Sequence, residues 1–176
     1  MKRTLGSLAL LAAAMFVPSL ATAQHTYVGV KACSLCHKSE AQGQQLSIWE
    51  KSKHANAYTE LTTPKADSIA KAKGSAKPAV ETAECLECHT IKGGPDAADP
   101  KQGVQCESCH GAGSDYKARA VMQKKDDAAS KGLVVWADKA AIEAMCKNCH
   151  NDKSPTNKPF NFDERWKDIA HKKPAA

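Results

Sequence analysis

Four copies of the pentapeptide C-x-x-C-H constrain this chain more than any other feature of its sequence. They read CSLCH, CLECH, CESCH and CKNCH, and together they use all eight cysteines of the 176 residues. The cysteines are Cys33, Cys36, Cys85, Cys88, Cys106, Cys109, Cys146 and Cys149, and the histidines that follow them are His37, His89, His110 and His150. The motif is typical of haem c, whose vinyl groups form thioethers with the two thiols and whose iron binds the histidine. The sequence therefore predicts four covalently attached haem c groups, each with its iron.

Two other uses of cysteine explain the pattern less well. Disulfide frameworks occur in exported proteins, but they do not place every cysteine at one short spacing with a histidine after each pair. Zinc sites use C-x-x-C pairs, but they have no need of a histidine directly after the second cysteine in every copy. Haem attachment explains the spacing, the histidine and the absence of a leftover cysteine.

The first 23 residues have the pattern of a secretory signal peptide. Lys2 and Arg3 precede an apolar run over residues 5–17, and small residues at 21–23 form a cleavage site. The run is too short to span a membrane, and no later run is longer. We expect cleavage after Ala23, a tetrahaem cytochrome c domain over residues 24–176, and export to the periplasm, with the cell exterior as the alternative.

The chain has few large apolar side chains with which to build a core. It contains three Trp, three Tyr and three Phe, so its own core would be small. We expect the haems to supply that core in a compact, mainly α fold with long loops and little or no sheet. Helices are expected over about 38–61, 64–73, 115–131, 137–150 and 161–172, with loops over 73–80 and 92–103. Motifs 2 and 3 begin only 21 residues apart, so we expect their haems to pack together.

A net charge of +6 would by itself suggest nucleic acid or an acidic partner. The propionates of four haems, together with the ferric irons, would bring the oxidised mature protein close to zero net charge, and reduction would make it negative. We therefore predict no binding to nucleic acid and interpret the scattered lysines as solvated surface.

Outside the motifs the chain has three histidines, fewer than the four irons that would need a second axial ligand. They are His25, His54 and His171, so at least one iron in a single chain cannot be ligated by two histidines. His54 lies near Leu46 and Trp49 on the expected first helix, and His171 follows the apolar stripe of the last. Both are predicted distal ligands. His25, near the mature N-terminus, and Met122 are the remaining candidates.

The order of these features resembles the tetrahaem cytochrome c-554 family. The similarity is carried by "KACSLCHKSEAQ", "KHANAY", "GVQCESCHGAG" and "FDERWKDIAH", and it spans most of residues 27–173. It implies that His54 serves the haem of motif 4 and His171 the haem of motif 3. It also implies a mostly helical fold with haems stacked in close pairs, a five-coordinate second haem, and a relay of electrons between periplasmic redox partners. The family has a further histidine shortly after motif 3 that serves the first haem; here the chain reads "SDYKARAVM", and Met122, then His25, is the nearest substitute.

The favoured function is electron transfer between redox proteins, with electrons hopping between closely packed haems. The sequence offers no acid–base or nucleophilic constellation, which argues against an enzyme. One alternative is a reductase of nitric oxide, nitrite or hydroxylamine at an open iron. Another is a subunit of an extracellular cytochrome filament, with His25 donated to the neighbouring subunit.

Overall fold

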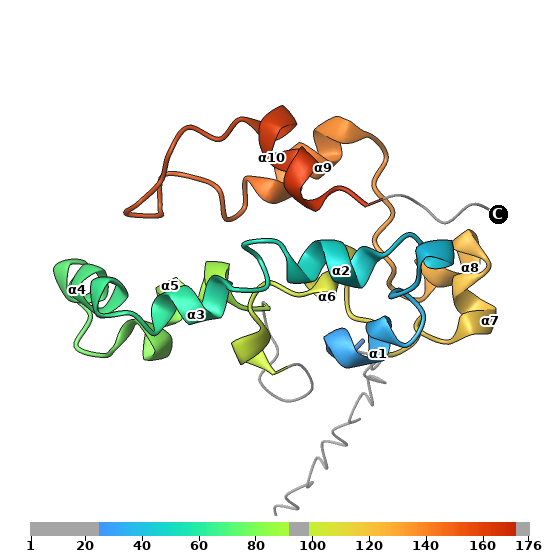
Figure 1. Cartoon of the computed structure of the whole chain (residues 1–176), viewed down its shortest axis with the longest axis horizontal. Coiled ribbons are helices and arrows are strands. Elements are labelled where there is room, and N and C mark those ends of the chain that lie inside the picture. Colours follow the sequence, from blue (N-terminus) through green and yellow to red (C-terminus); the bar gives the residue numbers. More distant parts are fainter. Residues whose placement is uncertain (1–24, 92–98, 172–176) are drawn as a thin grey trace, which may run out of the picture.

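The computed structural model describes residues 25–91 and 99–171, which form short helices joined by turns and loops (Figure 1). No strand occurs in these residues, so the prediction of a mainly α chain with long loops is confirmed. The helices are α1 Val30–Ser34, α2 Gln45–Glu50, α3 Ala57–Leu61, α4 Pro64–Ala72, α5 Ala83–His89, α6 Cys106–His110, α7 Arg119–Met122, α8 Lys125–Ser130, α9 Lys139–Cys146 and α10 Phe162–Ile169. Short 3-10 helices are η1 Glu40–Gln42, η2 Ala79–Glu81 and η3 Pro100–Gln102. The predicted signal peptide lies outside the described residues.

The helices form an elongated arrangement with two levels. In Figure 1, α9 and α10 lie together above a row that includes α2, α3 and α4, and α10 contacts α2. Helix α4 lies at one end of the row and helices α7 and α8 at the other. None of the helices in the described ranges is long and apolar enough to cross a membrane.

Capping residues fix the starts of the helices that sequence patterns predicted best. The Thr63 hydroxyl accepts a hydrogen bond from the Ala66 amide at the start of α4, where Pro64 occupies the first turn. Asn161 caps α10 in the same way through the Glu164 amide. Helices over 64–73 and 161–172 were expected. The starts of α4 and α10 agree with these bounds to within one residue, while α4 ends at Ala72 and α10 at Ile169. Residue 172 lies outside the described residues.

The expected single helix over residues 38–61 is wrong. Gly43 and Gln44 adopt left-handed backbone conformations with φ of 93° and 54°, which separates η1 from α2. After α2 the Ser52 hydroxyl donates to the Trp49 carbonyl, so a side chain takes an acceptor that a continuing helix would use. His54 therefore lies in a turn between α2 and α3 rather than on a helical face. The expected helix over 115–131 is likewise divided, into α7 and α8.

Very little of the described chain is buried apolar surface. Of its eight buried hydrophobic residues three are alanines, and the only large side chain with almost no exposure is the polar Gln105, at 1%. The one hydrophobic cluster joins α3, α4 and η2 through Leu61, Ala70 and Ala79. This small core agrees with the expectation that a bound group completes the fold.

A buried carboxylate fastens the N-terminal segment to motif 3. Glu107, which is 2% exposed, accepts hydrogen bonds of 2.7–3.1 Å from the amides of Val28, Gly29 and Gly113. Thr26 pairs with Ser114 alongside these contacts. The residue between the two cysteines of motif 3 thus holds segment 26–29 in place.

Candidate haem sites

Each C-x-x-C-H motif occupies about one helical turn. In motifs 1 and 4, the histidine amide donates to the carbonyl of the first cysteine, His37 to Cys33 at 3.1 Å and His150 to Cys146 at 3.0 Å. Motif 3 forms the whole of α6, and motif 2 forms the end of α5. A helical turn places residues i, i+3 and i+4 on one side, so both thiols and the imidazole of each motif can meet one ligand.

The cysteine side chains connect the four motifs in series. The Cys33 thiol of motif 1 donates a hydrogen bond to Cys106 of motif 3, which raises the pKa of Cys33 and lowers that of Cys106. Burial, with Cys146 of motif 4 nearby, raises the pKa of Cys109 to about 11. Burial and a hydrogen bond with Cys88 of motif 2 raise the pKa of Cys149 to about 12. These neighbouring cysteines therefore place the motifs in the order 1–3–4–2.

The expectation that the haems of motifs 2 and 3 pack together stays a prediction, since this order concerns the cysteines alone. Motif 4, which begins at the last residue of α9, lies near cysteines of both motifs. Closeness in sequence does not predict this proximity. No disulfide joins the eight cysteines, so each is available for thioether formation.

Two histidines from outside the motifs face motif histidines. The ring centroids of His54 and His150 lie 6.1 Å apart, and those of His110 and His171 lie 5.8 Å apart. Two imidazoles on opposite sides of one metal, each with a bond of about 2.0–2.1 Å, would have centroids roughly 6 Å apart. The spacing therefore fits a metal held between each pair.

The protonation and number of these groups also suit haem iron. Burial, followed by the charges of His171 and His37, lowers the pKa of His110 to about 4, and burial also lowers the pKa of His54. Both imidazoles are therefore neutral at neutral pH, which is the form that binds iron. No group of three or more His, Cys, Asp or Glu in the described residues could hold a metal ion. A pair of imidazoles suits an iron whose other four ligands come from a macrocycle.

Backbone contacts that sequence patterns did not reveal hold His54 in its turn. The Val104 amide donates to the His54 carbonyl at 2.9 Å, and the Trp49 indole donates to the Val104 carbonyl at 2.7 Å. Gly103 lies against the carbonyls of His54 and Ala55, with a positive φ of 70°. The segment before motif 3 thus positions the histidine that faces motif 4.

Replacing Gly103 by alanine should displace His54. The added Cβ would overlap the His54 carbonyl oxygen, and the positive φ is unfavourable for alanine. We expect the haem-loaded variant to lose low-spin signal from one haem in electron paramagnetic resonance. Gly74→Ala is the matched control, because Gly74 has a φ of 89° but no atom within 4 Å of an added Cβ. An unchanged spectrum for Gly103→Ala would contradict this role of Gly103.

The remaining predicted ligands are not brought into such pairs. The Nδ1 atom of His89 lies 2.7 Å from the Ala57 carbonyl, which leaves Nε2 available, while Nδ1 of His37 is buried without a hydrogen-bond partner. Within the described ranges neither ring faces a second imidazole. The His25 Nδ1 atom lies 2.9 Å from the Asp115 carboxylate, and Met122 is half-buried at the end of α7.

Comparisons with known proteins agree on one family. The family model described as "Cytochrome c554 and c-prime" matches residues 32–111. A cytochrome c-554 from Nitrosomonas europaea is 33% identical over 161 residues, which cover 80% of this chain and 66% of that relative. The chain thus spans about two thirds of the length of the curated relative that it matches. No solved structure matches the chain.

Proposed function

Because this chain belongs to the cytochrome c-554 family of c-type cytochromes, we propose that it is an exported electron carrier with four covalent haem c groups. The observation that carries the proposal is the facing of His54 with His150 and of His110 with His171. Both pairs join a histidine of a haem motif to a histidine far away in the sequence. Bound haem c supplies reversible one-electron chemistry at potentials that its axial ligands set.

The residues of the chain divide into attachment and ligation roles. The eight motif cysteines form the thioethers, and His37, His89, His110 and His150 are the proximal ligands. We assign His54 as the distal ligand at motif 4 and His171 as the distal ligand at motif 3. His25 and Met122 remain the candidates at motif 1. The order of neighbouring cysteines supports a relay with motifs 1 and 2 at its two ends.

The proposed location is the periplasm, and the proposed partners are other redox proteins, such as periplasmic or membrane cytochromes and oxidoreductases. The signal-peptide pattern of residues 1–23 supports export. The mature protein would occupy residues 24–176 as one domain.

A second candidate function is reduction of a small nitrogen compound at the iron of motif 2. One observation favours it: in the described residues His89 faces the Ala57 carbonyl on one side and no second imidazole. An iron with an open position could bind nitric oxide, nitrite or hydroxylamine. We propose this as a side activity of the carrier.

Low-temperature electron paramagnetic resonance of the oxidised, haem-loaded protein, with haem counted by absorbance and mass, tests both functions. Four haems per chain, with low-spin signals from the two paired sites, are expected. A high-spin signal that nitric oxide abolishes would assign an open iron, and turnover of that compound would then favour the reductase. A chain that matures with fewer than four covalent haems would contradict the tetrahaem proposal.

A further inference from the structure

A run of exposed lysines lies on and just after α4. Over residues 64–78 the chain has four lysines and one acid, Asp67. We call Lys65, Lys71, Lys73 and Lys77, which are all exposed, the α4 lysine patch. The Asp67 carboxylate is already used within the fold, where it accepts a hydrogen bond from the Ala79 amide at 2.8 Å.

Several lysines elsewhere in the described chain have acidic partners. Lys147 pairs with Glu143 at 2.7 Å, Lys124 with Asp127 at 3.7 Å, and Lys139 with Asp163. No lysine of the α4 patch takes part in an ion pair within residues 25–91 and 99–171. The four lysines of the patch are therefore exposed and available to an external partner.

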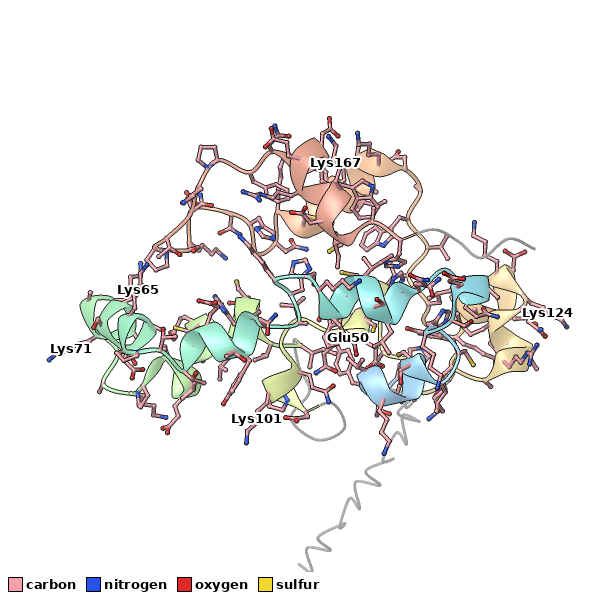
Figure 2. The ribbon with its side chains drawn as sticks, in the orientation of Figure 1. Glu50, Lys65, Lys71, Lys101, Lys124 and Lys167 are labelled. Atoms are coloured by element: carbon pink, nitrogen blue, oxygen red, sulfur yellow. The ribbon has the colours of Figure 1, made fainter. Side chains whose placement is uncertain are left out.

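The patch lies beside motif 2. Helix α4 packs against α3 and η2, and both of these pack against α5, which carries motif 2. The cluster of Leu61, Ala70 and Ala79 contacts both Cys85 and Leu86, so α4 and motif 2 share one core. Figure 2 shows Lys65 and Lys71 at one end of the molecule and Lys124 at the opposite end.

Motif 2 also lies at one end of the order 1–3–4–2 of neighbouring cysteines, because Cys88 is the neighbour of Cys149 in motif 4. An end of such a series is where a relay exchanges electrons with another protein. Exposed charges of one sign raise the rate of encounter with partners of opposite charge by roughly 10–1,000-fold at low salt.

We propose that the α4 lysine patch docks an acidic redox protein, which exchanges electrons with this chain at motif 2. The proposal rests on the proposed electron-carrier function. In one encounter one electron passes between the one-electron centre of the partner and the haem c of motif 2. Ferric iron becomes ferrous as the partner is oxidised, or the reverse, with no bond formed and no proton transferred. The contact is transient, since four lysines on one short helix and its loop offer a small interface.

The test compares two haem-loaded variants with the same change in charge. In the patch variant Lys65, Lys71, Lys73 and Lys77 become Glu; in the control variant Lys117, Lys124, Lys125 and Lys131, which are exposed around α7 and α8, become Glu. Stopped-flow reduction by reduced ferredoxin, a small acidic iron–sulfur protein, gives the second-order rate constant as a function of salt. Equilibrium binding of the two oxidised proteins gives a readout without electron transfer.

We expect the patch variant to lose at least about tenfold in rate at low salt, with a flattened salt dependence and weaker binding, and the control variant to lose less than about threefold. Equal losses in the two variants would overturn the proposal, because net charge would then explain both. Unchanged rates together with lost binding to phosphatidylglycerol vesicles would overturn it in favour of a lipid surface. A rate loss that follows a shifted midpoint potential would overturn it as well, since the lysines would then act on the haem.

An uncharged reductant separates this proposal from the proposed function. Photogenerated deazariboflavin radical should reduce the wild type and both variants at equal rates, because it carries no charge. If the wild type is not reduced by this radical, the electron-carrier function itself fails. If the radical reduces every form and the rate constant for reduction by ferredoxin is unchanged in the patch variant, only the docking proposal fails.

Discussion

Produced without its haems, this chain should show no cooperative unfolding transition. A stable domain needs a buried apolar core, and here the described residues bury five apolar side chains larger than alanine, in separate places. The largest fully buried side chain is the polar Gln105, and the exposed residues include Leu35, at 73%, within motif 1. Each motif would attach one haem, a large and mostly apolar macrocycle that would add buried surface. Without it the helices are too short to persist alone, since helices under about 12 residues are marginal in water.

The measurement is a thermal melt followed by circular dichroism on two forms of the mature chain. One form matures with haem, and the other carries alanine at all eight motif cysteines. We expect a cooperative melt for the first and a weak, sloping helical signal for the second. Leu35→Ala is the matched control, because it alters motif 1 at an exposed position and should leave attachment and the melt unchanged. Native helix content with a cooperative melt in the haem-free form would contradict the inference that haem forms the core.

Local sequence rules predicted the helix-rich class but failed where backbone turns decide the bounds. Pro64 and Asn161 mark helix starts by chemistry that operates within one turn, so α4 and α10 were predictable. The end of α2 at Glu50 was not predicted, because the apolar spacing of Leu46, Trp49 and His54 continues past it. A periodic pattern therefore indicated the side on which His54 lies but not the turn that holds it.

The pairing of distant histidines needed information from outside the chain. The resemblance implied that His54 serves motif 4 and that His171 serves motif 3, and the structure places each beside the histidine of that motif. Ligation itself stays a prediction. The contacts of Trp49 and Gly103 that hold His54 in place join segments about 50 residues apart, and no local sequence pattern predicts them.

The ion pairing of the lysines is another property that the sequence alone did not predict. In the sequence the lysines of the α4 lysine patch look like those elsewhere, since 25 Lys and Arg are spread along the chain. Only the structure reveals that Lys124, Lys139 and Lys147 have acidic partners and that the patch has none among the described residues. Net charge therefore predicted less about partners than the local balance of charge does.

Removing either distal histidine should open one iron. His171→Ala leaves His110 without the ring now 5.8 Å away, and His54→Ala does the same for His150 at 6.1 Å. An iron that loses a strong axial ligand changes from low to high spin and gains a position for an external ligand. Relative to the wild type, each variant should have one more high-spin ferric haem that binds nitric oxide, and the double variant should have two more. Lys167→Ala is the control, since Lys167 is an exposed residue of α10, the helix that precedes His171.

A conservative variant separates ligation from structural support. His171→Met keeps a sixth ligand and should preserve the low-spin state, but it should raise the midpoint potential of one haem by on the order of 100 mV, within the roughly 0.8 V that axial ligands span. A histidine that only packs beside His110 would leave this potential unchanged when replaced. Potentiometric titration of the wild type, His171→Met and His171→Ala therefore distinguishes the two roles. Low-spin haem and unchanged potentials in all three proteins would mean that the close approach of His171 to His110 reflects packing, and the assignment of His171 would be wrong.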